Sequence, residues 1–181
     1  MKISTPNMPA MFLTYLYKGV SEELALTPKQ VKELNYIMVE VGAESKDGKP
    51  YLQAHAQGSF DSYDERVLKQ LQPKQQVRLE QIWLQKVGLV VLTNPKYQKA
   101  VGLTQAQVTK VQSIFAASQT EVSSIIAKDA KFEGGKATIP PATIEKIKKS
   151  RTDAQAAVRK ELTPAQLNAW QNLQGKPFRA T

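Results

Sequence analysis

Four short segments of this sequence share one pattern, and they decide how the chain folds. LTPKQ stands at residues 26–30, LQPKQ at 71–75, LTQAQ at 103–107 and LTPAQ at 162–166. With 16 Leu, 12 Thr and 18 Gln in the chain, random order would produce an LTxxQ segment only about 0.1 times. The four segments are therefore repeats that share a physical role.

The pattern matches the capping box that begins an α-helix. The hydroxyl of an N-cap threonine accepts a hydrogen bond from the N–H three residues later, where a glutamine side chain accepts one from the N-cap N–H. A proline at the first helical position costs no hydrogen bond, because that N–H has no partner inside the helix. We expect helix initiation to be the role of the pattern, with direct ligand contact as the alternative. The predicted capping residues are Thr27, Gln30, Gln72, Gln75, Thr104, Gln107, Thr163 and Gln166.

Between these caps, apolar residues recur at steps of three and four, which is the period of an α-helix. Such stripes run over residues 31–41, 79–90, 108–125 and 144–162. No segment shows the sustained alternation of a β-strand. The sequence predicts an all-α fold with no sheet, with loops at 42–62 and 132–140, where turn-forming residues gather.

The two halves of the chain also match each other. Residues 21–37 align with 98–114, and residues 67–82 align with 158–173. We interpret the chain as a single domain of two tandem helical hairpins, at about 9–92 and 93–178, that arose by internal duplication. Each hairpin then has to bury one apolar face against the other hairpin or against a second chain.

Composition excludes several kinds of chemistry. The chain of 181 residues has no cysteine and one histidine, which excludes thiol nucleophiles, disulfides, cysteine-ligated zinc and two-histidine metal faces. It has no phosphate-binding loop, dinucleotide fingerprint or nucleophile motif. No apolar run reaches the roughly 20 residues of a membrane-spanning helix. We expect a protein that is not an enzyme, needs no cofactor and does not span a membrane.

The formal net charge of +9 favours acidic partners, and it is unevenly distributed. Twelve basic and six acidic residues lie from residue 103 onward, so that +6 of the charge falls there. The run Lys146, Lys148, Lys149 and Arg151 is a candidate client or partner surface. A solvated helix face is the simpler interpretation of such a run, and nucleic-acid binding is not favoured because lysine outnumbers arginine 20 to 5.

A second candidate surface lies near the N-terminus, at residues 11–17. Met11, Phe12 and Tyr15 belong to this apolar stretch. It forms either a first helix packed into the core or an adaptable binding surface of the kind that Met-rich and aromatic patches provide. We expect a helix of the mature protein here and not a signal peptide, because no small-residue cleavage site follows.

His55 lies in a polar loop with carboxylates after it in the sequence. Asp61, Asp64 and Glu65 could join it in a metal or acid–base site. A single loop histidine without a ligand motif is more often inert, so no metal site is assigned.

The segments NPKYQKAVGLTQAQVTKV at 94–111 and ELTPAQLNAWQNLQGKPF at 161–178 make the sequence resemble a known family. It is similar over residues 19–178 to the LTXXQ-motif proteins of the bacterial envelope, the Spy/CpxP-like group, as a larger member with several motifs. The resemblance implies an all-α fold, which in this family often forms a cradle-shaped dimer. It also implies a function as an ATP-independent chaperone or as a stress or metal-response adaptor. This sequence departs from the family in having four motif positions, no visible signal peptide, and Gln72 in place of a threonine.

From the residues and the resemblance together we expect a non-enzymatic protein that holds unfolded or acidic protein clients on a basic, partly apolar helical surface. An adaptor or structural subunit that docks to a larger assembly through its N-terminal helix is the alternative, and a metal-responsive sensor is a weaker one. The resemblance implies a periplasmic or envelope location and allows a homodimer, while the sequence leaves a cytoplasmic location open.

Overall fold

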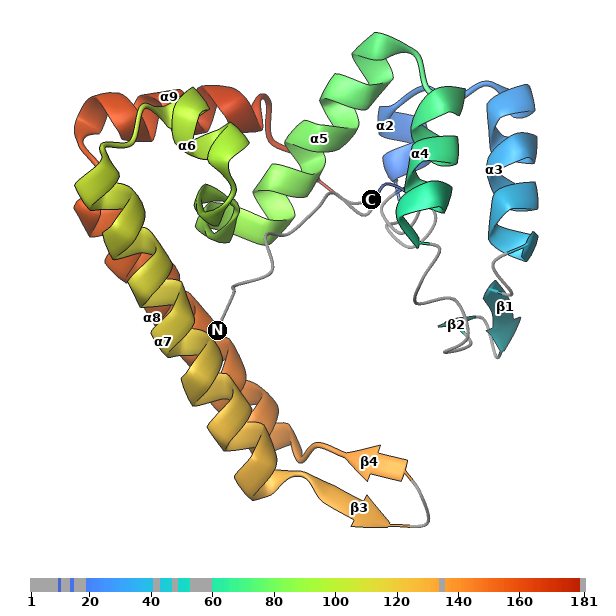
Figure 1. Cartoon of the computed structure of the whole chain (residues 1–181). Coiled ribbons are helices and arrows are strands. Elements are labelled where there is room, and N and C mark those ends of the chain that lie inside the picture. The colour runs from blue at the N-terminus through green and yellow to red at the C-terminus, as the bar shows by residue number, and fades with distance from the viewer. Residues whose placement is uncertain are drawn as a thin grey trace. The chain divides into compact units, whose positions relative to one another are not determined.

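The computed structural model describes residues 10, 14, 19–40, 43–46, 49–52, 60–133 and 136–179. Helices make up most of this part of the chain, so the prediction of an all-α protein is confirmed. Each expected loop also holds a short antiparallel ribbon, where no strand was predicted. Strand β1 (Ala43–Lys46) pairs with β2 (Lys49–Leu52), and β3 (Lys131–Glu133) pairs with β4 (Lys136–Thr138) (Figure 1).

The sequence carries a local signal for both ribbons. Asp47 and Gly48 separate β1 from β2, and Gly134 and Gly135 separate β3 from β4. Asp-Gly and Gly-Gly are the dipeptides that favour two-residue hairpin turns. The strands are only three or four residues long, which is too short for alternation of apolar residues to reveal them.

The chain divides into two compact units. Unit 1 includes Val87–Asn172, and unit 2 includes the described part of Asn7–Lys86 together with the residues from Leu173 onward. The boundary between the two units, at Val87, lies close to the predicted boundary between residues 92 and 93. The C-terminal segment differs from the prediction, because it groups with the first half of the chain and not with the second.

Both units follow the same order of elements, namely a short helix, a long helix, a ribbon, a return helix and a further helix. A tandem duplication as the origin of this order stays a prediction. In unit 2 the order is α2 (Val20–Glu23), α3 (Pro28–Glu40), the β1–β2 ribbon, α4 (Phe60–Gln70) and α5 (Pro73–Val87). In unit 1, after the 3-10 helix η2 (Gly88–Thr93), it is α6 (Pro95–Val101), α7 (Gln105–Asp129), the β3–β4 ribbon, α8 (Pro141–Glu161) and α9 (Pro164–Gln174).

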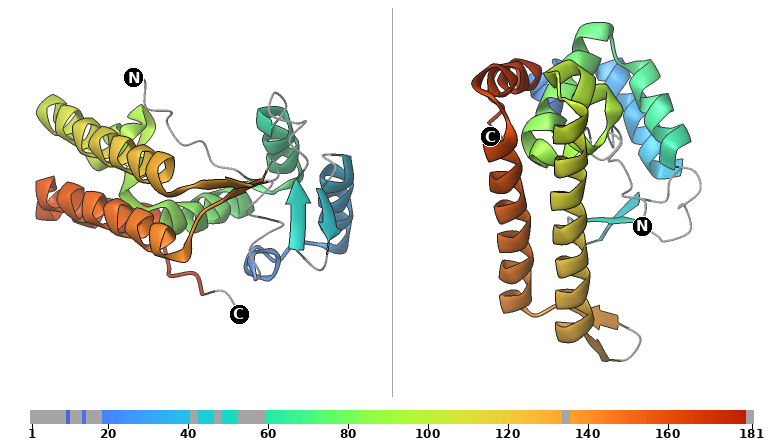
Figure 2. Two further views of the ribbon diagram at one scale, coloured as in Figure 1. Left: turned by 90° about the horizontal axis from the view of Figure 1, so that it is seen from below. Right: turned by 60° about the vertical axis from the view of Figure 1, so that its left-hand side comes forward.

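Each unit has its own apolar core. In unit 1, α7 and α8 lie side by side as a long antiparallel pair, and both also pack on η2 (Figure 2). The fully buried side chains there include those of Val91, Leu92, Val111 and Val158. In unit 2 the core is built from α2, α3, α4 and α5, with buried residues that include Val20, Leu34, Ile37, Val67, Leu79 and Ile82. Both tryptophans, Trp83 and Trp170, are buried as core residues.

The predicted capping boxes form at the three LTxxQ segments that contain a threonine. The Gln107 N–H lies 3.3 Å from the Thr104 hydroxyl oxygen, and the Thr104 N–H lies 3.0 Å from Gln107 Oε1. The same two bonds join Thr27 to Gln30 and Thr163 to Gln166. The helix-initiation role of the pattern is therefore present in the structure.

The fourth segment has only half of the capping box. The Gln72 N–H donates to Gln75 Oε1 at 2.8 Å. The reverse bond, from the Gln75 N–H to the Gln72 side chain, is absent from this described part of the chain. Gln72 stands where the other three segments have a threonine, and its longer side chain is exposed. A hydroxyl at this position would supply the missing acceptor.

We predict that Gln72→Thr stabilises the protein, because it completes the capping box of α5. The free energy of unfolding should rise by about 0.5–1 kcal/mol in urea denaturation followed by circular dichroism. Gln72→Ala is the control, since it removes the same side chain without adding a hydroxyl. Equal stability of the Thr and Ala variants would contradict the prediction.

Candidate functional site

The glutamines of the four segments do more than cap their own helices, because they meet in pairs. In unit 1, Gln107 Nε2 donates to Gln166 Oε1 at 2.8 Å, and Gln166 Nε2 donates to Gln107 Oε1 at 2.9 Å. Each amide group is thus both donor and acceptor to the other. We call this arrangement a reciprocal glutamine pair.

Unit 2 contains the same arrangement. Gln30 Nε2 donates to Gln75 Oε1 at 2.7 Å, and Gln75 Nε2 lies 3.3 Å from Gln30 Oε1. The two residues are 45 positions apart in the sequence, so the pair joins the start of α3 to the start of α5. In both units the pair links a long helix to the helix that follows the return helix.

The remaining amide hydrogen of each glutamine also has a partner. It donates to a backbone carbonyl just before the opposite segment, where a helix or turn has ended and left the oxygen without an intrahelical bond. These acceptors are Gln70 O for Gln30, Leu24 O for Gln75, Glu161 O for Gln107 and Gly102 O for Gln166, at 2.8–3.0 Å. Every glutamine therefore caps its own helix and closes the end of another.

The sequence held an indication of this second role. A glutamate accepts from the N-cap N–H as well as a glutamine does. All four segments nevertheless have glutamine, which alone carries the amide hydrogens that the pair requires. The pattern within each segment predicts its cap but not the pairing, because a partner 45 or 59 residues away leaves no local periodicity.

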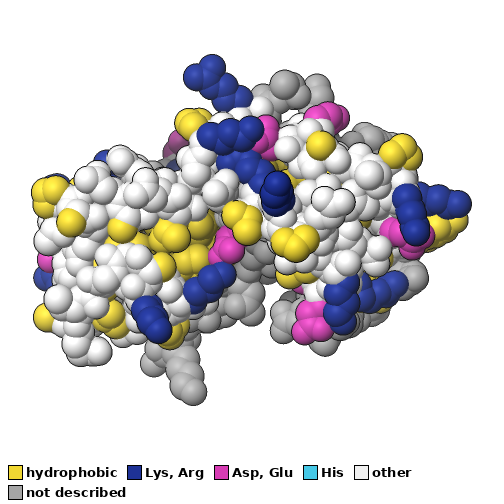
Figure 3. Space-filling model, turned by 90° about the horizontal axis from the view of Figure 1, so that it is seen from above, with side chains coloured by type: hydrophobic (Ala, Val, Ile, Leu, Met, Phe, Trp, Pro, Cys, Tyr) yellow, Lys and Arg dark blue, Asp and Glu magenta, His cyan; other side chains and the backbone are white. Residues whose placement is uncertain are grey.

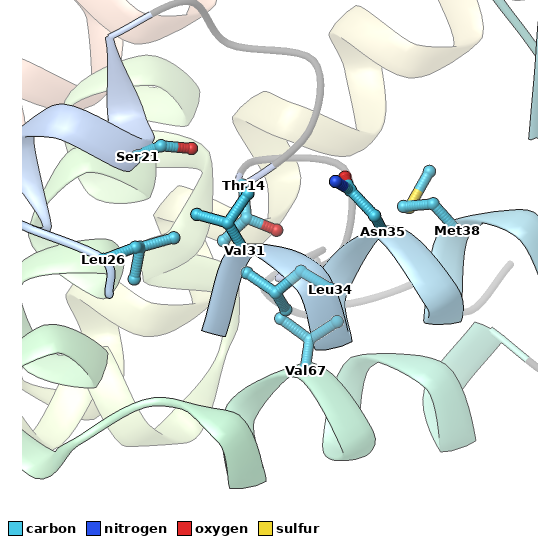
Figure 4. Close-up of a pocket in the computed structure, with 8 residues that line it drawn as sticks. All are labelled: Thr14, Ser21, Leu26, Val31, Leu34, Asn35, Met38 and Val67. Atoms are coloured by element: carbon cyan, nitrogen blue, oxygen red, sulfur yellow. The ribbon is translucent and has the colours of Figure 1, made fainter. Parts of the chain in front are cut away.

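Helix α3 has an apolar pocket on one side. It has a volume of about 120 Å³, and Leu26, Val31, Leu34, Met38 and Val67 form its apolar lining. Thr14, Ser21 and Asn35 add polar groups (Figure 4). The volume suits one apolar side chain and is too small for a cofactor.

The other side of α3 borders a shallow groove against α4. The groove has a volume of about 280 Å³ and contains both an aromatic side chain, Tyr36, and two cations, Arg66 and Lys69. Tyr36 is 53% exposed and Val39, one turn further along α3, is 72% exposed. We call Tyr36 and Val39 with this groove the α3 surface.

The basic run on α8 is locally neutralised. Lys146 pairs with Asp129 at 2.9 Å, Lys148 with Glu145 at 2.7 Å, and Lys149 with Asp153 at 2.6 Å. Arg151, the fourth residue of the predicted surface, is exposed. Because each lysine has an acidic neighbour, this run is a mixed-charge helix face and not a continuous positive patch.

The pKa values of two groups in this run reflect the ion pairs. A hydrogen bond from Lys146, with a second from Thr143, lowers the pKa of Asp129 below its ordinary value. The Asp153 carboxylate raises the pKa of Lys149. On the face drawn in Figure 3, acidic side chains likewise stand beside several of the lysines and arginines.

The other predicted site residues fall outside the part of the chain that can be described. Met11, Phe12 and Tyr15 lie there, although Ala10 and Thr14 in the same stretch are helical and buried. His55 also lies there, so the structure does not test a metal site in its loop. Among the described residues, no three His, Asp or Glu side chains gather closely enough to hold a metal ion.

Comparison with family models, with curated proteins and with solved structures finds no match to this chain. The resemblance to the LTXXQ-motif family therefore rests on the four segments themselves. Among the described residues, no helix is both long enough and apolar enough to cross a membrane.

We predict that the reciprocal glutamine pair is energetically coupled. Gln107→Ala and Gln166→Ala should each lower the free energy of unfolding by about 2 kcal/mol, because each leaves the partly buried amide of the other glutamine without its partner and removes a cap. The double variant should lower the free energy of unfolding by about 1 kcal/mol less than the sum of the two single losses.

The measurement is a double-mutant cycle in urea denaturation. Gln112→Ala is the matched control, since Gln112 is an exposed residue of α7 and should change stability by less than about 0.5 kcal/mol. Strictly additive costs for Gln107 and Gln166 would show that each acts only as a cap of its own helix.

Proposed function

We propose that this protein is a non-enzymatic, ATP-independent chaperone of the envelope type that its motifs resemble, and that it holds unfolded protein clients on the α3 surface. The observation that carries the proposal is the exposure of large apolar side chains on α3. A helix that belongs to a unit core normally buries its apolar residues, whereas Tyr36 and Val39 are more than half exposed.

The position of α3 supports this role. In unit 2 its main helical neighbour is α4, which covers only one of its faces. Leu34, Ile37 and Met38 face inward and are buried, while Val31, predicted to lie on the same inward stripe, is 37% exposed at the apolar pocket. An apolar pocket and a groove of mixed apolar and cationic character thus lie on either side of one helix, which suits weak contacts with many different sequences.

The charges around the α3 surface suit a client with acidic groups beside its apolar ones. Arg66 and Lys69 line the groove next to Tyr36, and Glu33 is its one acidic lining residue. The Lys32 ammonium also lies 5.8 Å from the centre of the Tyr36 ring. Electrostatic attraction would speed capture of an acidic segment, and apolar contact would hold it.

The α3 surface suits a client better than the basic run on α8 does. Three of its lysines already have acidic partners, so they offer little net attraction at a distance. The groove between α3 and α4 combines apolar and cationic groups within one pocket, which the α8 face does not. An envelope location remains part of the proposal through the motif resemblance alone.

The test is suppression of aggregation of a reduced, acidic client such as α-lactalbumin, followed by light scattering without ATP. Reduction leaves this protein unaffected because it has no cysteine. We predict that Tyr36→Ser with Val39→Ser raises the concentration needed for half-suppression about fivefold, equivalent to about 1 kcal/mol of lost apolar contact. Rising salt should weaken suppression by the unchanged protein.

Val77→Ser is the matched control, because Val77 is 56% exposed on α5, outside the α3 surface. It should leave suppression unchanged, and circular dichroism should show that all variants keep their helices. Failure of the unchanged protein to suppress aggregation at several-fold molar excess would refute the proposed function. Equal loss in the Val77 variant would refute its assignment to the α3 surface.

A further inference from the structure

The chain leaves α9 at Gln174 and then lies on α5 as an extended segment. Within unit 2, Gln174 and Lys176 accept hydrogen bonds through their backbone carbonyls, and Phe178 donates one through its backbone N–H. We call residues 174–178, sequence QGKPF, the C-terminal segment. Its contacts with α5 are those of a peptide bound to a protein surface.

One side chain of α5 binds most of this backbone. Gln85 Nε2 donates to Gln174 O at 2.7 Å and to Lys176 O at 2.8 Å, and Gln85 Oε1 accepts from the Phe178 N–H at 2.7 Å. Arg78 Nη1 adds a bond of 2.8 Å to Lys176 O. Such bonds recognise an extended main chain whatever its side chains are.

Three further features select particular residues in the segment. The Lys176 ammonium lies 3.1 Å from Glu23 Oε1, which also accepts from Arg78 at 2.7 Å. These bonds, chiefly the one from Lys176, lower the pKa of Glu23 below its ordinary value of 4.5 and keep it ionised. The Lys86 ammonium lies 5.6 Å from the centre of the Phe178 ring, within the range of a cation–π contact.

Gly175 is the third selective feature. Its φ angle of +61° belongs to the left-handed region, which side chains other than glycine adopt at a cost. A Cβ atom there would also crowd the side-chain amide of Gln81, which would have to move aside. The site therefore favours glycine at position 175, lysine at 176 and an aromatic residue at 178.

The segment is attached as a ligand would be and is not part of the core. Gly175, Lys176 and Pro177 are exposed. The α5 residues that contact the segment, Arg78, Gln81 and Gln85, follow helical spacing along one stripe. The buried residues of α5 are Gln75, Leu79, Ile82, Trp83 and Leu84, which lie on other positions of the helix.

From this geometry we propose that the stripe of α5 with Glu23 is a peptide-binding site, filled in this chain by its own C-terminal segment and able to bind an extended Gly-Lys-Pro-Phe peptide in its place. The site does not depend on the proposed chaperone function, because none of its residues belongs to the α3 surface.

The covalent link explains why the chain's own segment occupies the site. A tethered ligand acts at an effective concentration of the order of millimolar. If the free peptide binds with a dissociation constant of about 100 μM, the tethered segment fills the site roughly ten times as often as it leaves it free. A peptide from outside must compete with it. The free site should become measurable once the tethered segment is weakened.

The experiment uses the whole chain with Lys176→Glu and Phe178→Ala, which removes the attraction to Glu23 and the ring contact. The probe is a fluorescein-labelled, N-acetylated peptide QGKPFR, and binding is followed by fluorescence anisotropy. The weakened chain should bind the probe up to about tenfold more tightly than the unchanged chain does. Adding Gln85→Ala should reduce that binding at least tenfold again.

A peptide with the same residues in scrambled order is the control, and it should bind at least tenfold more weakly, because it keeps only the main-chain bonds. The proposal is overturned if the weakened chain keeps its helices but does not bind the probe up to about 1 mM, or if it binds the scrambled peptide equally well. Loss of helical structure in the weakened chain would also overturn it, since the segment would then be a structural element. The aggregation assay measures the α3 surface separately, so either proposal can fail alone.

Discussion

The reciprocal contact between two glutamine side chains is the constraint on which each unit of this structure depends. It brings the first turns of two helices together at a fixed distance, because both amide groups donate and accept at once. Gln107 and Gln166 do this in unit 1, and Gln30 and Gln75 do it in unit 2. A shift of either helix by one residue would leave two amides and two chain carbonyls without partners. A partly buried polar pair in which every group has a partner makes the core rigid and specifies one packing arrangement.

The binding surfaces follow from how each unit is held. At its start, α3 is joined to α5 through Gln30, but along the rest of its length it has α4 as its main helical neighbour. Apolar groups at its far end, Tyr36 and Val39, therefore remain exposed. In α5, the residues that pack into the core lie at other positions than Arg78 and Gln85. The stripe with Arg78 and Gln85 can therefore bind an extended segment. Both proposed sites are thus helix faces that the described helices of unit 2 do not use for its core.

Some of the fold could be predicted because its causes are local. A threonine, a proline and a glutamine within five residues determine where a helix begins, and apolar spacing determines which face it buries. The ribbons carried local evidence as well, in Asp47–Gly48 and Gly134–Gly135, but their strands are too short to show alternation. The basic run at Lys146–Arg151 was also visible, whereas its neutralisation by Asp129 required a residue on another helix.

By itself the sequence determined the helical class, the helix starts and the absence of thiol chemistry, since each depends on residue type or on neighbours within one turn. Only the tertiary structure decided which glutamine meets which, that Tyr36 and Val39 face outward, and that the segment after Gln174 joins the first half of the chain. The glutamine and C-terminal contacts join groups 40 or more residues apart, and the exposure of Tyr36 and Val39 depends on how α3 packs on another helix. Their energies arise from geometry that forms only when the helices pack, and no local pattern encodes it.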